Sequence, residues 1–138
     1  MAQPDRTYPV QRTEAEWRQI LSPEEYEVLR QRGTERSCSG AYFAEKRPGT
    51  YHCRACNQAL FESQTKFDSG TGWPSFFKPI QQGRVVELTD RSHGMVRTEV
   101  VCSNCGSHLG HVFPDGPKPT GMRYCINSLS LKLEPKAE

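Results

Sequence analysis

The sequence predicts a single, mainly β domain with two short helices at its front. Two capped amphipathic segments open the chain, and from Gly40 onward short alternating segments are separated by Gly, Pro and Asn. With 138 residues, the chain is long enough to close one hydrophobic core. We therefore predict one domain over residues 1–138, with residues 1–12 and 134–138 as loosely ordered tails.

The two helices are predicted by their N-terminal capping residues. Thr13 with Glu16, and Ser22 with Glu25, have the spacing of a capping box, and a proline occupies the first helical position of the second segment. Apolar stripes follow each box, formed by Trp17, Ile20 and Leu21 and then by Tyr26, Val28 and Leu29. Gly33 suits the position just past a helix end.

Alternating polar and apolar residues predict antiparallel strands in the rest of the chain. Residues 84–89 and 95–101 flank a polar, glycine-containing turn, which predicts a hairpin. Residues 123–133 predict one last strand. Because side chains alternate between the faces of a strand, Arg123, Cys125 and Asn127 are expected on the same face.

Four of the six cysteines form two Cys-x-x-Cys motifs, Cys53 with Cys56 and Cys102 with Cys105. Each motif presents two thiolates from a tight turn, and two motifs fill the four corners of a tetrahedral zinc ion. The alternatives are a pair of disulfides or a redox motif, but a redox Cys-x-x-Cys normally occurs once and near a βαβ pattern. We therefore predict one structural Zn²⁺ per chain, whose closed ligand set leaves no position for a substrate.

Composition and charge exclude several other classes of protein. The net charge of +2 is too small to indicate binding to nucleic acid or to a membrane surface. No stretch is apolar enough to span a bilayer, and the first six residues lack the apolar run of a signal peptide. No nicotinamide or flavin motif is present. Because free thiols and a thiolate metal site favour a reducing compartment, we expect a cytoplasmic protein.

The two remaining cysteines, Cys38 and Cys125, predict thiol chemistry. Two spare thiols far apart in sequence suggest a nucleophile and a second thiol that resolves it. Arg123 lies on the expected face of Cys125, and a nearby cation lowers the pKa of a thiol. The amide of Asn127 would lie close enough to bond a thiolate or a bound substrate.

Two further motifs are candidates for the same site. His108 and His111 follow the second Cys-x-x-Cys, and imidazoles suit general acid–base catalysis because they titrate near neutral pH. Trp73 lies in a rigid segment between glycines and a proline and could form the wall of an apolar pocket. The alternatives are two surface or hydrogen-bonded histidines without a catalytic role and a tryptophan buried in the core.

Together, these motifs resemble those of the methionine-R-sulfoxide reductase B family. The resemblance runs from about residue 33 to residue 133. It includes both Cys-x-x-Cys motifs and four further segments, Gly72-Trp73-Pro74-Ser75-Phe76, His108-Leu109-Gly110-His111-Val112-Phe113, Asp115-Gly116-Pro117 and Arg123-Tyr124-Cys125-Ile126-Asn127-Ser128. An ordered set of motifs is far more specific than any one of them.

The resemblance implies a β-tent-like fold of two antiparallel sheets and an enzyme that repairs oxidised proteins. Such an enzyme reduces the R epimer of peptide-bound methionine sulfoxide to methionine. The resemblance implies that Cys125 is the nucleophile and is converted to a sulfenic acid, then to an intramolecular disulfide that thioredoxin reduces. The expected partners are oxidised proteins or peptides and thioredoxin, and we expect the chain to act as a monomer.

The resemblance also implies roles for the neighbouring side chains. The substrate-binding residues are Trp73, Phe113 and Arg123. The residues that organise the sulfoxide oxygen are His108, His111 and Asn127.

The chain departs from the family pattern at one position. In many members the resolving cysteine lies just before the Gly-Trp-Pro motif, where this chain has Thr71. Cys38 is the remaining free thiol and lies in a polar segment, so we predict that it resolves Cys125. The alternative is that Cys38 is a buried small apolar residue and that an external thiol resolves Cys125.

A zinc-ribbon binding module is the competing class of function. The two Cys-x-x-Cys motifs are compatible with it, but the sequence has no cluster of basic and aromatic residues. A binding module would also have no use for Cys125 between Arg123 and Asn127. A reductase should have one reactive cysteine of low pKa besides the metal ligands, whereas the module should have none.

Overall fold

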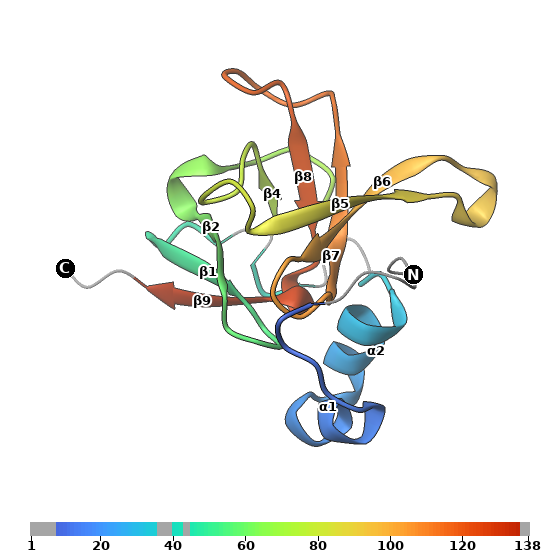
Figure 1. Cartoon of the computed structure of the whole chain (residues 1–138). Coiled ribbons are helices and arrows are strands. Elements are labelled where there is room, and N and C mark those ends of the chain that lie inside the picture. Colours follow the sequence, from blue (N-terminus) through green and yellow to red (C-terminus); the bar gives the residue numbers. More distant parts are fainter. Residues whose placement is uncertain (1–7, 36–39, 43–44, 136–138) are drawn as a thin grey trace.

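The computed structural model describes residues 8–35, 40–42 and 45–135, without the side chain of His93. Within these residues the chain forms two short helices and two antiparallel sheets (Figure 1). In Figure 1 the helices lie together below the sheets, and the β5–β6 hairpin extends away from the body. The prediction of a mainly β fold with two antiparallel sheets is confirmed.

The two helices begin where the capping boxes predict. Helix α1 spans Glu14–Ile20 and helix α2 spans Pro23–Gln31. In each box the N-cap hydroxyl accepts a hydrogen bond from the backbone of the glutamate three residues later, and that glutamate accepts one in return. Their buried side chains are Trp17, Tyr26, Val28 and Leu29. Among the described residues, neither helix is long and apolar enough to cross a membrane.

The C-terminal end of α2 differs from the simplest expectation. Gly33 lies just past the helix, as predicted, and its N–H donates to the carbonyl of Glu27 at 2.9 Å. The left-handed residue, however, is Arg32, with φ of 58°. Glycine adopts this conformation without steric cost, whereas a side chain makes it less favourable. The turn directs the side chain of Arg32 toward β5 and β6, where its guanidinium forms ion pairs with two carboxylates.

The smaller sheet has three strands in the order β2-β1-β9. They are β1 (Gly49–Cys53), β2 (Ala59–Glu62) and β9 (Leu131–Pro135). Within the described part of the chain, the larger sheet has six strands in the order β3-β4-β8-β7-β6-β5. They are β3 (Lys66–Phe67), β4 (Ser75–Phe76), β5 (Val85–Asp90), β6 (Arg97–Cys102), β7 (His108–Phe113) and β8 (Arg123–Ile126). Single 3₁₀ turns are η1 (Ser63–Thr65), η2 (Ser92–Gly94) and η3 (Ser128–Ser130).

The predicted hairpin is confirmed as β5 and β6, but the single strand predicted over residues 123–133 is wrong. Strand β8 ends at Ile126, η3 follows, and β9 belongs to the other sheet. The polar side chains at the break bond to backbone groups of neighbouring elements: Asn127 Nδ2 donates to the carbonyl of Leu109, and Ser130 Oγ donates to that of His108. These side-chain bonds favour a turn over a continued strand.

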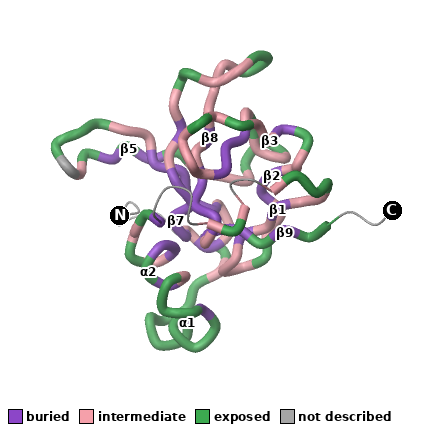
Figure 2. Tube along the Cα trace, turned by 180° about the vertical axis from the view of Figure 1, so that it is seen from behind, coloured by how far each residue is buried: buried purple, intermediate pink, exposed green. Residues whose placement is uncertain are grey.

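Aromatic side chains from both sheets form the core between them. Phe61 of β2 stacks on Phe76 of β4 with ring centroids 4.5 Å apart, and Tyr51 of β1 meets Phe76 edge-on at 5.2 Å. All three rings are fully buried. Figure 2 shows the buried residues gathered at the centre, whereas the end of the β5–β6 hairpin is exposed. This core holds β4 and β8 against the small sheet.

The two predicted tails extend into described residues. Before α1, Tyr8 is buried against Leu88 and Val101, and the N–H of Val10 donates to the carbonyl of Asn104 at 2.8 Å. Strand β9 includes residues 134–135. The rest of both tails, residues 1–7 and 136–138, lies outside the described residues.

Candidate active site and metal centre

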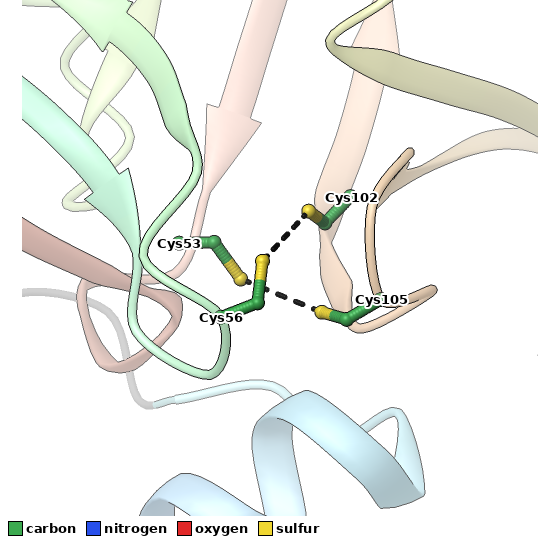
Figure 3. A group of neighbouring side chains, drawn as sticks. All are labelled: Cys53, Cys56, Cys102 and Cys105. Carbon is green, nitrogen blue, oxygen red and sulfur yellow. Dashed lines mark hydrogen bonds between the residues drawn. The ribbon is translucent and has the colours of Figure 1, made fainter. Parts of the chain in front are cut away.

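The two Cys-x-x-Cys motifs meet at the join between the sheets. Figure 3 shows their four side chains converging on one point. The four sulfur atoms all lie within 4.8 Å of one another. The sulfur of Cys53 is 3.7 Å from that of Cys105, and the sulfur of Cys56 is 3.6 Å from that of Cys102. Each close pair therefore joins one motif to the other.

The two motifs fold into the same turn. The residue after the second cysteine, Asn57 in one turn and Gly106 in the other, is left-handed with φ of 71° and 75°. In both turns its N–H donates to the carbonyl of the first cysteine at 2.8 Å. Only glycine fits at position 106 of the second turn, because a Cβ atom there would lie 2.6 Å from the ring of Tyr8. The turns thus aim all four thiols at a common centre.

This geometry fits a four-coordinate metal ion with sulfur ligands. A tetrahedral zinc site with Zn–S bonds of about 2.3 Å requires neighbouring sulfurs about 3.8 Å apart. The observed separations are close to that value. Thiols this close cannot all ionise without a cation between them. The hydrogen bond with Cys102 is the main reason that the pKa of Cys53 is raised and that the pKa of Cys56 is lowered. A bound dication would offset this competition.

Cys125 lies in a separate cavity of about 160 Å³ on the larger sheet. Strand β8 is flanked by β4 and β7, and Cys125 is opposite Ser75 on one side and His111 on the other. Gly110 of β7 allows the close approach, since a Cβ atom there would collide with the carbonyl oxygen of Cys125. The cavity is lined by Thr34, Thr71, Trp73, Arg97, Gly110, His111, Phe113, Arg123, Cys125 and Asn127.

The aromatic and cationic walls of the cavity are held by contacts of their own. Trp73 Nε1 donates to the carbonyl of Glu35 at 2.9 Å, which fixes the indole. Arg123 lies over the ring of Phe113, with its guanidinium carbon 4.5 Å from the centroid. Two hydrogen bonds to Asp115, at 2.9 and 3.1 Å, orient the same guanidinium. These walls are therefore preorganised.

Asn127 is buried and held from two directions. Its side-chain oxygen accepts from the N–H of Glu35 at 3.0 Å, and its Nδ2 donates to the carbonyl of Leu109 at 3.0 Å. Glu35 thus contacts both Asn127 and Trp73 through its backbone. Its carboxylate also accepts from the N–H of Leu129 at 2.9 Å. The segment before Cys38 consequently fixes two walls of the cavity.

The thiol of Cys125 is not activated in the way its neighbour Arg123 suggests. Burial raises its pKa, while the charge of Arg123 and a hydrogen bond with Thr71 lower it by less. The prediction of a low-pKa thiol is therefore wrong, because the cost of ionising a buried sulfur exceeds the benefit from one cation. The thiol needs a proton acceptor to react as a thiolate.

His111 is paired with a carboxylate that the sequence did not indicate. Its Nε2 is 2.8 Å from Oδ2 of Asp90. Burial raises the pKa of Asp90, but hydrogen bonds from Ser92 and His111 and the charge of Arg32 hold it well below its usual range. Asp90 is therefore ionised and accepts the bond from the imidazole. Burial lowers the pKa of His111 more than Asp90 raises it, so the ring is neutral at neutral pH.

His108 lies behind His111 and not in the Cys125 cavity. The two rings are 5.5 Å apart, and both line a second, polar cavity of about 500 Å³. His108 is buried, and its Nδ1 is 2.8 Å from Oε2 of Glu99, which is also buried. Burial raises the pKa of Glu99, but the hydrogen bond with His108 and the charges of His108 and Arg32 together hold it below its usual range. Each histidine thus has its own carboxylate.

Arg32 connects the two histidine–carboxylate pairs. Its guanidinium lies 3.1 Å from Asp90 and 3.2 Å from Glu99. Arg97 forms a further ion pair with Asp90 at 3.4 Å. These four charged groups were missed from sequence because they come from the turn after α2 and from β5 and β6. The alternation along β5 and β6 was the available signal, since it predicts inward-facing Asp90 and Glu99.

Comparison with known proteins shows extensive similarity. Residues 21–135 match the SelR domain. Proteins named peptide methionine sulfoxide reductase MsrB are similar over almost their whole length. One from Pseudomonas putida strain GB-1 is 58% identical over 92% of this chain and 97% of its own. One from Pseudomonas syringae pv. syringae is 59% identical over 93% and 98%.

The chain belongs to the methionine-R-sulfoxide reductase B family. Of the eight residues predicted for catalysis and substrate binding, six line one cavity: Trp73, His111, Phe113, Arg123, Cys125 and Asn127. His108 lies in the adjoining cavity. Cys38 lies outside the described residues. Thr71, at the position of the resolving cysteine in many family members, lines the cavity beside Cys125.

Proposed function

We propose that this protein is a peptide-methionine (R)-S-oxide reductase, with Cys125 as its nucleophile. The observation that carries this proposal is the cavity in which one thiol, one carboxylate-bound imidazole and two aromatic rings converge. Its volume of about 160 Å³ suits one amino-acid side chain better than a whole cofactor. Trp73 and Phe113 provide apolar surface for a methyl group, and Arg123 and Asn127 provide donors for polar groups of the substrate.

The first step requires proton movement as well as a soft nucleophile. His111 donates through Nε2 to Asp90, so its Nδ1 is available to accept the proton of Cys125. Cys125 sulfur then attacks the sulfoxide sulfur, while the imidazolium returns the proton to the sulfoxide oxygen. Asp90 stabilises the transient positive charge. This role fits a neutral imidazole beside a thiol whose pKa is raised.

The oxygen is transferred from the substrate to Cys125. The S–O bond of the sulfoxide and the S–S bond formed in the attack both break as the hydroxyl moves to the cysteine sulfur, so methionine leaves with two more electrons and Cys125 becomes a sulfenic acid. A second thiol then attacks the sulfenic sulfur and releases water, which forms a disulfide. We propose Cys38 as this thiol and thioredoxin as the dithiol that reduces the disulfide. A Cys38–Cys125 disulfide detected by mass spectrometry after one equivalent of sulfoxide would support that assignment.

For the cysteine cluster, we propose one structural Zn²⁺. Cys53, Cys56, Cys102 and Cys105 would hold it, and four thiolates leave no open position. The ion would join the small sheet to the large one, because each motif belongs to a different sheet. Its contribution is therefore to folding. A cytoplasmic location and a monomeric state stay predictions.

Turnover of separated R and S epimers of a methionine sulfoxide peptide tests the function. With dithiothreitol as reductant, we expect the wild type to convert the R epimer and leave the S epimer unchanged. Cys125→Ser should abolish turnover and retain the wild-type zinc content. Conversion of both epimers, or full activity in Cys125→Ser, would contradict the proposal.

A further inference from the structure

A chain of hydroxyl groups runs from Cys125 into the buried part of the larger sheet. Thr71 lines the same cavity as Cys125, and a hydrogen bond between the two side chains lowers the pKa of the thiol. Oγ1 of Thr71 is 2.8 Å from Oγ of Ser69, which in turn is 2.8 Å from Oγ of Ser75. The last hydroxyl also reaches the carbonyl of Trp73, at 3.2 Å. Ser75 is fully buried, whereas Ser69 and Thr71 are half-buried.

Each hydroxyl in this chain has one proton, so its hydrogen bonds can point in two directions. In the first, Cys125 donates to Thr71, Thr71 to Ser69 and Ser69 to Ser75. The last proton then goes to the carbonyl of Trp73. In the second, the order is reversed: Ser75 donates to Ser69, Ser69 to Thr71, and Thr71 to the sulfur. The same heavy-atom positions thus serve a thiol in one arrangement and a thiolate in the other.

Backbone contacts hold the chain in place while the protons reorient. The N–H of Thr71 donates to Ser69 Oγ, and the N–H of Trp73 donates to Thr71 Oγ1, both at 3.4 Å. Ser75 is fixed by strand β4, where it is directly opposite Cys125. These contacts involve the same short segment that contains the tryptophan wall of the cavity. Reversal therefore needs only rotation about C–O bonds.

We propose that Thr71 is a catalytic residue whose hydroxyl stabilises the thiolate of Cys125, and that Ser69 and Ser75 make this possible by reversing their hydrogen bonds. This inference rests on the proposed role of Cys125 as the nucleophile. Burial opposes the ionisation of this sulfur. A hydrogen-bond donor to the sulfur lowers the free-energy cost of ionisation. When His111 removes the thiol proton, Thr71 turns to donate. The same donor then faces the oxidised sulfur after oxygen transfer.

Removal of single hydroxyls tests the chain. In Thr71→Val, a variant of nearly the same shape, we expect the pH midpoint of Cys125 alkylation by iodoacetamide to rise by roughly one unit. The single-turnover rate at neutral pH should fall about tenfold with little change in KM. Thr71→Ser should restore both values. Ser75→Ala should shift the midpoint in the same direction by less, because it removes the far end of the chain.

The measurement is specific to Cys125 because the tryptic peptide of residues 124–132 contains no other cysteine. Thr50→Val, on β1 of the other sheet, is the matched control and should leave the midpoint unchanged. Thr71→Ala is a second variant in case valine prevents folding. An unchanged midpoint in folded Thr71→Val or Thr71→Ala would overturn the catalytic role, and an unchanged midpoint in Ser75→Ala would overturn the reversible chain.

Alkylation requires no sulfoxide, so this result stands apart from the proposed function. Absence of sulfoxide turnover in the wild type would refute the reductase. The alkylation midpoints would still test the proposed chain of hydrogen-bonded hydroxyl groups.

Discussion

The cysteine cluster and the Cys125 cavity use the same side chain in opposite ways. In the cluster, four sulfurs crowd together with separations down to 3.6 Å. In the cavity, the single sulfur of Cys125 has a hydroxyl and a guanidinium as its neighbours. The cluster lies where two sheets meet, whereas the cavity lies on one sheet.

The difference shows that the neighbours of a thiol decide its chemistry. Crowded sulfurs compete for protons until a metal dication replaces those protons. The free energy of metal–sulfur binding then contributes to folding. A single buried sulfur keeps its proton until a base removes it, and the resulting thiolate can attack an electrophile. The first arrangement should therefore govern stability and the second should govern rate.

The largest expected effect separates these two roles with one type of substitution. Cys102→Ser removes one of the four proposed metal ligands, and we expect loss of zinc and of the cooperative thermal transition, because the binding energy of a structural zinc is folding energy. Cys125→Ser is the matched control and should unfold within a few degrees of the wild type. Elemental analysis and thermal unfolding measure both. A folded, zinc-free Cys102→Ser variant would remove the distinction.

The second effect sharpens the description of the cavity. His111→Ala should lower the single-turnover rate by roughly 10²–10³-fold, since general acid–base catalysis contributes on this scale. His108→Ala should have a smaller effect, because His108 lies in the adjoining cavity behind the first ring. Rapid-quench measurements at saturating sulfoxide compare the two. Equal losses would mean that both histidines act on the substrate.

The smallest effect concerns acid stability, which depends on the histidine and carboxylate groups beside the Cys125 cavity. The folded-state pKa values of Asp90 and Glu99 are lowered, so their stabilisation is present above the unfolded pKa values and is lost as pH falls through the folded ones. The pKa of His111 is also lowered, so the unfolded chain binds a proton more readily below its ordinary pKa. All three groups make the protein less stable in acid.

Thermal unfolding between pH 7 and about pH 2 measures this dependence, because the carboxylates lose their contribution only below their ordinary pKa of about 4. We expect the wild-type melting temperature to fall steadily across the range. Asp90→Asn should melt at a lower temperature near neutral pH but lose less stability as the pH falls below about 4, because it cannot bind the proton. A steeper pH dependence in Asp90→Asn would assign the acid sensitivity to other groups.

Local signals explain what could be predicted from the sequence. Capping boxes act within four residues, so the starts of α1 and α2 were predictable from Thr13 and Ser22. Alternation acts within a strand, so the common cavity of Arg123, Cys125 and Asn127 was predictable as well. It failed after Asn127, where side-chain hydrogen bonds to other elements ended the strand.

By itself, the sequence determined the mainly β class, the helix starts, the four metal-ligand candidates and the thiol at the centre of the site. These depend on spacing and residue type, which are properties of short segments. Only the tertiary structure decided which sulfurs are closest, which carboxylate holds each histidine, and whether the pKa of Cys125 rises or falls. Those outcomes depend on burial and on distances between residues far apart in the chain. Such quantities exist only once the two sheets have packed together.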